Sequence, residues 1–115
     1  MMGHINGNTK ATVQIRQITQ DEYQTDRVRW KDAFSVSGVL DLLDGGVNLK
    51  MMSRTGEADY IFICDYFVPA YNGEKLTAEN SRFLIDGEVY EVKLFDDPMN
   101  LQEHLEIYLK YLGGQ

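Results

Sequence analysis

The chain has 115 residues, of which 43% are hydrophobic and 25% are charged, and its net charge at pH 7 is −7. These totals exclude a disordered chain and predict one globular domain with a single modest core. No apolar run approaches the roughly 20 residues of a membrane-spanning helix, and we expect no signal peptide, because the first residues lack its basic and apolar regions. One cysteine excludes an internal disulfide framework, so we expect a reducing compartment.

The charge is unevenly distributed along the chain. Residues 1–54 carry seven Lys or Arg against six Asp or Glu, whereas residues 55–115 carry four against twelve. Such a surface repels free nucleic acid, because non-specific binding relies on many contacts of Lys and Arg with phosphate. We expect a solvated acidic face. The alternatives are an acidic face that meets a basic neighbour, or one that lines a passage for DNA.

The N-terminal part predicts one weak strand between two polar segments. Residues 1–10 are rich in Gly, Asn and polar residues and predict a flexible N-terminal arm. Residues 12–18 alternate, with Val13 and Ile15 facing inward, and predict a first strand. Residues 19–26 are polar and predict a connection.

A longer strand is predicted over residues 27–37. Asp32 interrupts its apolar face and indicates a bulge or a strand end, and Gly38 indicates a second bend before residues 39–43. The alternation places four apolar residues on one face (Val28, Trp30, Phe34 and Val36) and five others opposite (Arg27, Arg29, Lys31, Ala33 and Ser35).

Two long loops are predicted. Residues 44–56 contain several Gly, Asn and Ser residues, but also Leu49, Met51 and Met52, which are unusual in solvent. These three side chains either pack against the core or form a contact surface for another protein. The second loop covers residues 69–80.

Two stretches give clear strand signals. Residues 60–67 are aromatic and β-branched and apolar on both faces up to Asp65, which predicts a central, doubly covered strand. Residues 82–95 predict a hairpin that turns at Asp86-Gly87. In this register Arg82 lies opposite Glu91, and one face collects the apolar residues Phe83, Ile85, Tyr90, Val92 and Leu94.

The segment 101–112 fits two structures. As a helix, Asn100 and Glu103 form a capping box, Gly113 ends it, and the apolar stripe is Leu101, Leu105, Tyr108 and Leu112. As a strand, its inward residues are Leu105, Ile107, Leu109 and Tyr111, and its outward residues are His104, Glu106, Tyr108 and Lys110.

The residues capable of chemistry form no recognisable catalytic or metal-binding pattern. Cys64 lies in an apolar strand, where a buried structural thiol is expected rather than a nucleophile. His4 and His104 do not match the spacing of a zinc site with it. Asp96 and Asp97 precede Pro98, and such carboxylates typically cap backbone N–H groups. Asp44-Gly45-Gly46 lacks the lysine of a phosphate-binding loop. We therefore predict a non-enzymatic protein without metal or cofactor.

These elements predict a mainly β fold: a small antiparallel barrel or sandwich of six to seven strands with long loops. The domain covers residues 11–115 and follows the N-terminal arm. On residue patterns alone, this is a β domain that binds another protein.

Several short motifs of the second half together resemble one family. They are Phe62-Ile63-Cys64-Asp65-Tyr66, Asp86-Gly87-Glu88-Val89-Tyr90-Glu91-Val92, Asp96-Asp97-Pro98-Met99, and His104–Lys110 followed by Gly113-Gly114. In this order and spacing they resemble the head–tail connector proteins of tailed bacteriophages and prophages, which include head-closure, adaptor and minor capsid proteins. The similarity begins near Trp30, and residues 1–29 do not take part in it.

The resemblance implies a component of the virion neck that is made in the host cytoplasm. Such proteins form a ring, commonly twelve-fold, that docks on the portal or its adaptor, helps to retain packaged DNA, and offers a surface to the tail proteins. DNA passes nearby without sequence-specific binding, and no membrane is involved. The family has no catalytic residues. It also implies a β-barrel with a C-terminal strand, which decides our choice of a strand over residues 101–112.

A closed ring needs two different contact patches on each subunit. The candidate basic patch is Arg27, Arg29 and Lys31, and the candidate acidic patch is Glu91, Asp96, Asp97, Glu103 and Glu106. Leu49, Met51 and Met52 are candidates for a partner contact, and either long loop could gate the channel or bind a neighbouring ring.

Three other functions compete with this one. The first is a different β-barrel adaptor of the phage tail or baseplate, or a generic protein-binding domain. The second is an enzyme that uses Cys64 and His104. The third is a nucleic-acid-binding barrel, which the charge disfavours.

Overall fold

Two strands joined at Asp86-Gly87 form the predicted hairpin in the predicted register. The computed structural model of this protein describes residues 7–43 and 58–114. β6 (Ser81–Ile85) and β7 (Glu88–Asp96) are antiparallel, with Arg82 opposite Glu91. Asp86 and Gly87 have φ angles of 52° and 76°, as the type I′ turn requires.

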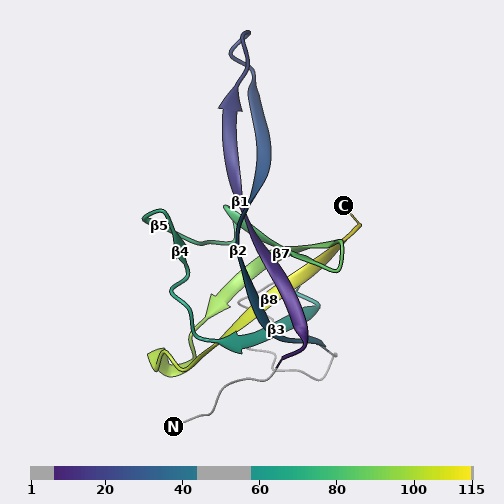
Figure 1. Ribbon diagram of the computed structural model, residues 1–115, viewed down its shortest axis with the longest axis vertical. Helices are drawn as coiled ribbons and strands as arrows, with labels where there is room; N and C mark the ends of the chain where they lie inside the picture. The colour runs from purple at the N-terminus through teal and green to yellow at the C-terminus, as the bar shows by residue number, and fades with distance from the viewer. Residues whose placement is uncertain (1–6, 44–57, 115) are drawn as a thin grey trace.

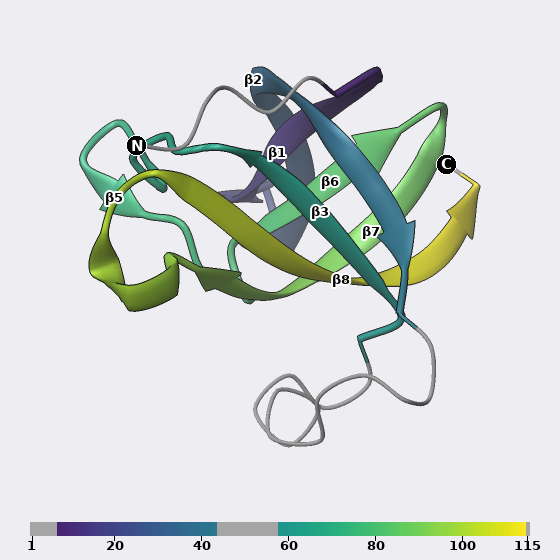
Figure 2. The ribbon, with the colours of Figure 1, turned by 90° about the horizontal axis from the view of Figure 1, so that it is seen from below.

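Six strands close into an antiparallel barrel, which confirms the predicted mainly β fold (Figures 1 and 2). The order around the barrel is β1-β2-β3-β8-β7-β6, and β6 pairs with β1 to close it. Within the described ranges, no helix is long and apolar enough to span a membrane. The remaining bounds are β1 (Thr9–Gln20), β2 (Asp26–Leu42), β3 (Tyr60–Asp65), β4 (Ala70–Tyr71), β5 (Glu74–Lys75), η1 (Pro98–Asn100) and β8 (His104–Gly114).

The C-terminal segment is a strand, so the strand prediction is confirmed and the helix alternative is wrong. β8 pairs with β3 on one side and with β7 on the other. A helix there would leave the backbone edges of both neighbours unpaired, which is costly in a barrel wall. Its inward residues Leu105, Ile107 and Leu109 are buried as predicted. Two other predictions on this strand are wrong: Tyr111, expected inward, is 42% exposed, and Tyr108, expected outward, is 5% exposed.

The barrel interior is filled by side chains from every barrel strand. Phe62 and Phe83 are fully buried, and their ring centroids lie 5.6 Å apart in an edge-to-face contact. On β3, Phe62 and Cys64 face the interior, whereas Ile61 and Ile63 lie half-buried on the outside. The predicted double cover of this strand is therefore wrong, because one face of a barrel strand remains on the surface.

A bulge in β7 changes one predicted core residue. Val92 pairs with Leu109 and Leu94 with Tyr108, so Lys93 is the extra residue. The alternation shifts by one after the bulge, and Phe95 rather than Leu94 packs against the core. The prediction of Leu94 on the inner face is wrong for this reason.

A second bulge lies in β2, where the sequence predicts an irregularity. Val13 pairs with Phe34 and Gln14 with Asp32, which leaves Ala33 as the extra residue. Phe34 packs against the core, but Trp30, on the other side of the bulge, pairs with Arg16 on the outward face. The predicted common face of Val28, Trp30, Phe34 and Val36 is therefore wrong.

Gly38 lies where β2 changes partner. It pairs with Thr9 of β1 and with Cys64 of β3, and β2 continues through it to Leu42. A Cβ atom at this position would lie 2.4 Å from the carbonyl oxygen of Ile63, so the close approach of the two backbones requires glycine.

β1 and β2 extend beyond the barrel as a two-stranded ribbon. β1 pairs with β6 only from Thr12 to Ile15, and β2 pairs with β3 only from Gly38 to Leu42. Residues 16–30, which we call the projecting hairpin, therefore form strand pairs only with one another and stand out from the barrel in Figure 1. At its base, the backbone N–H of Arg16 donates to the carbonyl oxygen of Asn80 at 2.8 Å. The predicted polar connection over residues 19–26 is shorter, because the strands continue to Gln20 and from Asp26.

Three predicted flexible segments have different outcomes. Within the N-terminal arm, residues 1–6 lie outside the described residues, and Thr9 and Lys10 belong to β1. The loop 44–56 lies outside them entirely. The loop 69–80 contains a short hairpin of β4 and β5, whose turn residues Asn72 and Gly73 have φ angles of 51° and 82°. Leu76 follows it and is buried in the core.

Candidate functional site

The side chains of Cys64 and His104 lie on opposite sides of the barrel wall. Cys64 is 1% exposed, and burial, together with the Asp65 charge, raises the pKa of its thiol to about 12. His104 lies on the outer face, with its Nε2 atom 3.0 Å from Oε2 of Glu106. Cys64 and His104 therefore do not form a thiol–imidazole pair. No group of three or more His, Cys, Asp or Glu residues in the described ranges is placed to hold a metal ion.

The Asp96-Asp97-Pro98 turn follows the predicted chemistry. Asp97 precedes η1, and its Oδ1 atom accepts a hydrogen bond of 3.0 Å from the backbone N–H of Gln102. The backbone N–H of Asn100 donates to the carbonyl oxygen of Asp97. This carboxylate is therefore engaged in holding the loop that leads into β8.

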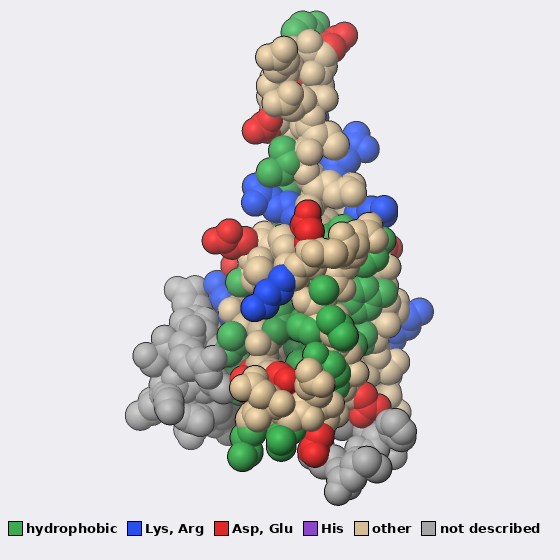
Figure 3. Space-filling model, turned by 90° about the vertical axis from the view of Figure 1, so that its left-hand side faces the viewer, with side chains coloured by type: hydrophobic (Ala, Val, Ile, Leu, Met, Phe, Trp, Pro, Cys, Tyr) green, Lys and Arg blue, Asp and Glu red, His purple; other side chains and the backbone are tan. Residues whose placement is uncertain are grey.

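The candidate basic patch lies on the projecting hairpin and continues by one residue, Lys31, into the barrel part of β2. Arg27, Arg29 and Lys31 are exposed and pair with Thr19, Gln17 and Ile15, which places all three on one face of the ribbon. One of them has a local partner: Nη2 of Arg27 lies 3.3 Å from Oδ2 of Asp21. Figure 3 shows Lys and Arg side chains around the lower part of the hairpin and acidic ones at its tip.

Four of the five candidate acidic residues come together at one end of the barrel, and one does not. Asp96 pairs directly with Glu106, Asp97 follows at the end of β7, and Glu103 precedes β8. Glu91 lies on the outer face in the middle of β7, where its Oε1 atom is 3.1 Å from Nζ of Lys93. The other three candidates, Leu49, Met51 and Met52, lie outside the described residues.

A polar row anchors the base of the projecting hairpin to the barrel. Gln14 is 5% exposed; its Nε2 atom donates to Oδ1 of Asp32 at 2.8 Å, and Nε of Arg82 donates to its Oε1 atom at 2.7 Å. The Arg82 guanidinium also lies over the Trp30 ring, 4.5 Å from its centroid. Burial lowers the pKa of Arg82. Sequence reasoning missed this row, because it joins three strands far apart in the chain.

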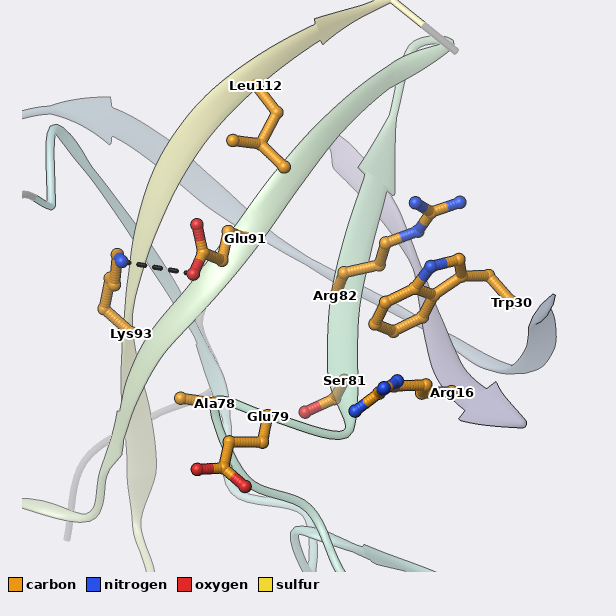
Figure 4. A pocket seen from close by; sticks show the side chains of 9 residues that line it. All are labelled: Arg16, Trp30, Ala78, Glu79, Ser81, Arg82, Glu91, Lys93 and Leu112. Carbon is orange, nitrogen blue, oxygen red and sulfur yellow. Dashed lines mark hydrogen bonds and ion pairs between the residues drawn. The ribbon is translucent and has the colours of Figure 1, made fainter. Parts of the chain in front are cut away.

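Beside this row lies a groove of about 530 Å³ on the outside of the barrel (Figure 4). Its wall combines apolar surface with cationic groups from β1, β6 and β7. Such a surface can receive a group that is both aromatic and acidic. Two acidic residues, Glu79 and Glu91, also line it, beside Arg16, Trp30, Ala78, Ser81, Arg82, Lys93 and Leu112.

The tip of the projecting hairpin is an ordered turn with exposed side chains. Oδ1 of Asp21 accepts hydrogen bonds of 2.9 Å from the backbone N–H groups of both Tyr23 and Thr25. The hydrogen bond from Thr25 is the largest cause of the lowered pKa of Asp21. Tyr23 is 80% exposed, and Glu22 is also exposed. An Asx turn at Asp21 is the sequence signal that identifies this tip.

No protein-family model matches the chain, and no curated protein is detectably similar to it.

Proposed function

We propose that this protein is a structural subunit of the neck of a tailed bacteriophage, a head–tail connector or head-completion protein. Its copies form a ring that docks on the portal or adaptor, helps to retain packaged DNA and joins the tail. The short motifs between Phe62 and Gly114 support this proposal, and so does the small antiparallel barrel, which is the fold that the resemblance implies.

The observation that carries the proposal is the separation of two charged surfaces on one chain. The basic stripe of Arg27, Arg29 and Lys31 lies on the projecting hairpin and at its base, whereas the acidic group around Asp96 and Glu106 lies at one end of the barrel. Contact between different patches of successive copies is heterologous, which is the geometry of a closed ring. One exposed ion pair contributes only about 0–1 kcal/mol, so such a contact acts through many copies.

Charge reversal on the stripe tests the proposal. We expect the double variant Arg27→Glu, Arg29→Glu to fold but not to assemble on the portal ring of the same phage, as seen by electron microscopy of the mixed proteins. Lys75→Glu is the matched control, because Lys75 is exposed on β5, away from the stripe. Assembly of the double variant at the level of the control would contradict the role of the stripe. Binding of the unaltered chain to a tail or baseplate ring instead of the portal would favour the alternative adaptor function.

A further inference from the structure

We propose that the tip of the projecting hairpin of one copy binds in the groove at the hairpin base of a second copy. In this contact Glu22 lies against Arg16 and Arg82, and the Tyr23 ring packs beside Trp30 and Leu112. The inference rests on the proposed function, since it adds a second contact between neighbouring subunits of the ring to the contact of the basic stripe with the acidic group.

The groove carries one net positive charge next to apolar surface, because Arg16, Arg82 and Lys93 face Glu79 and Glu91. Arg16 is exposed, and its side chain makes no ion pair with any described residue. Arg82 uses its Nε atom for Gln14, and the rest of its guanidinium lies over Trp30. Glu91 and Lys93 compensate each other, which leaves Glu79 as the acidic residue against two arginines. Leu112 adds a side chain that is 58% exposed. The groove thus selects an anionic group with an apolar or aromatic neighbour.

The tip offers that combination. Asp21 is already engaged by two backbone N–H groups and by Arg27, so its charge serves the turn itself. Glu22 next to it makes no ion pair with a residue in the described ranges. Tyr23 is 80% exposed, and a large exposed tyrosine is a typical anchor of a protein interface. The tip therefore matches the groove in charge and in aromatic character.

The tip cannot reach the groove of its own chain. Four residue steps of paired ribbon lead from the groove residues Arg16 and Trp30 to the last pair, Gln20 with Asp26, which is about 13 Å at 3.3 Å per residue. Figure 1 shows the ribbon directed away from the barrel. The occupant is therefore the tip of a second copy.

The same contact accounts for two exposed apolar residues of the ribbon. Ile18 pairs with Val28 on the face that also carries Trp30, and their side chains are 56% and 51% exposed. A second copy seated in the groove covers this face as well. The stripe of Arg27, Arg29 and Lys31 lies on the opposite face and stays available for another subunit or for the portal.

Self-association of the purified chain tests the contact, with Trp30 as a built-in reporter. Trp30 is the only tryptophan, so its emission reports on the groove alone. We expect the emission to change with concentration as copies associate, followed in parallel by sedimentation velocity. Glu22→Arg, Tyr23→Ala and Arg16→Glu should each weaken association by about tenfold or more. The double variant Glu22→Arg, Arg16→Glu should recover part of the association relative to either single charge reversal, because the attraction between positions 22 and 16 is restored while Arg82 keeps its charge. Glu74→Arg, on the exposed turn of β4 and β5, is the control.

The outcomes separate this inference from the proposed function. If the copies associate but the tip variants change neither the association nor the Trp30 emission, the contact lies elsewhere and the inference is wrong. The inference is also wrong if the free chain stays monomeric at every concentration and its Trp30 emission does not change when it binds to the portal ring. If tip and groove bind each other only within a two-fold dimer, and no ring appears in electron micrographs, the inference stands and the proposed function fails. Far-ultraviolet circular dichroism shows that each variant is folded.

Discussion

The barrel and the projecting hairpin are built from the same two strands, yet they are stabilised differently. Within the barrel, each strand has a neighbour on both sides and an inner face covered by the core. Beyond Arg16 and Trp30, β1 and β2 have only each other. An isolated two-stranded ribbon is marginally stable in water. The barrel therefore supplies most of the free energy of unfolding. The hairpin instead carries exposed charged and apolar side chains that are suited to contacts with other molecules.

The boundary between the two regions is a bulge and a polar row. Ala33 shifts the alternation of β2, so that residues on the core face of the barrel continue as the basic face of the hairpin. Gln14 joins Asp32 to Arg82 at the same level. These features fix the direction in which the hairpin leaves the barrel.

The largest difference between the two regions should appear on truncation of an aromatic residue. We expect Phe83→Ala to lower the free energy of unfolding by about 3–5 kcal/mol, because it leaves a cavity against Phe62. Tyr23→Ala at the hairpin tip should change it by less than about 0.5 kcal/mol. Urea denaturation followed by circular dichroism measures both, and equal losses would contradict the division.

A change at the barrel corner should have the next largest effect. We expect Gly38→Ala to destabilise the chain by about 1–3 kcal/mol, because the added Cβ meets the backbone of Ile63. Gly114→Ala is the matched control, since its Cβ would have no neighbour within 4 Å. Urea midpoints that shift equally for both variants would show that the close approach at Gly38 does not matter.

The polar row should link the stability of the two regions. We expect Gln14→Leu to cost about 1–2 kcal/mol, because Asp32 and Arg82 both lose a hydrogen-bond partner. Hydrogen exchange should also become faster within residues 16–30. Gln17→Leu on the exposed ribbon face is the control. Faster exchange in the control than in Gln14→Leu would contradict the anchoring role.

The buried thiol should make the barrel sensitive to alkaline pH. Burial raises the pKa of Cys64 from 9.0 to about 12, so the folded chain holds this proton more firmly than the unfolded chain. The resulting contribution to stability is complete below pH 9 and is lost as the pH rises toward 12. We expect the free energy of unfolding to fall less steeply over this range in Cys64→Ala than in the unaltered chain. Parallel pH profiles would contradict the prediction.

The smallest effect is expected at the hairpin tip. The hydrogen bonds from Thr25 and Tyr23 lower the pKa of Asp21 below 3.8. The ionised carboxylate therefore stabilises the turn above pH 3.8, and this stabilisation is lost as the pH falls through the lowered pKa. We expect the amide resonances of Tyr23 and Thr25 to shift only in this acid range, and to be displaced at all pH values in Asp21→Ala. Glu22→Ala is the control, and an identical displacement there would contradict the assigned turn.

Local chemistry determined much of the barrel. The Asp86-Gly87 turn and the alternation around it predict the register of β6 and β7, because a two-residue turn allows one pairing. Val13, Phe62 and the β8 residues Leu105, Ile107 and Leu109 follow from period-two patterns in the same way, whereas Tyr111 does not. Asn72-Gly73 carries an equally strong signal for the short hairpin of β4 and β5.

Only the tertiary structure decided where the bulges lie, where β2 changes partner and which residues form the groove. The groove residues Arg16, Trp30, Arg82 and Leu112 come from different strands and meet because barrel closure brings β1, β2, β6, β7 and β8 together. A bulge moves every later side chain to the other face, so periodicity alone placed Trp30 and Leu94 on the wrong side. Sequence pattern sets the faces of single strands, whereas closure of the barrel sets which faces meet.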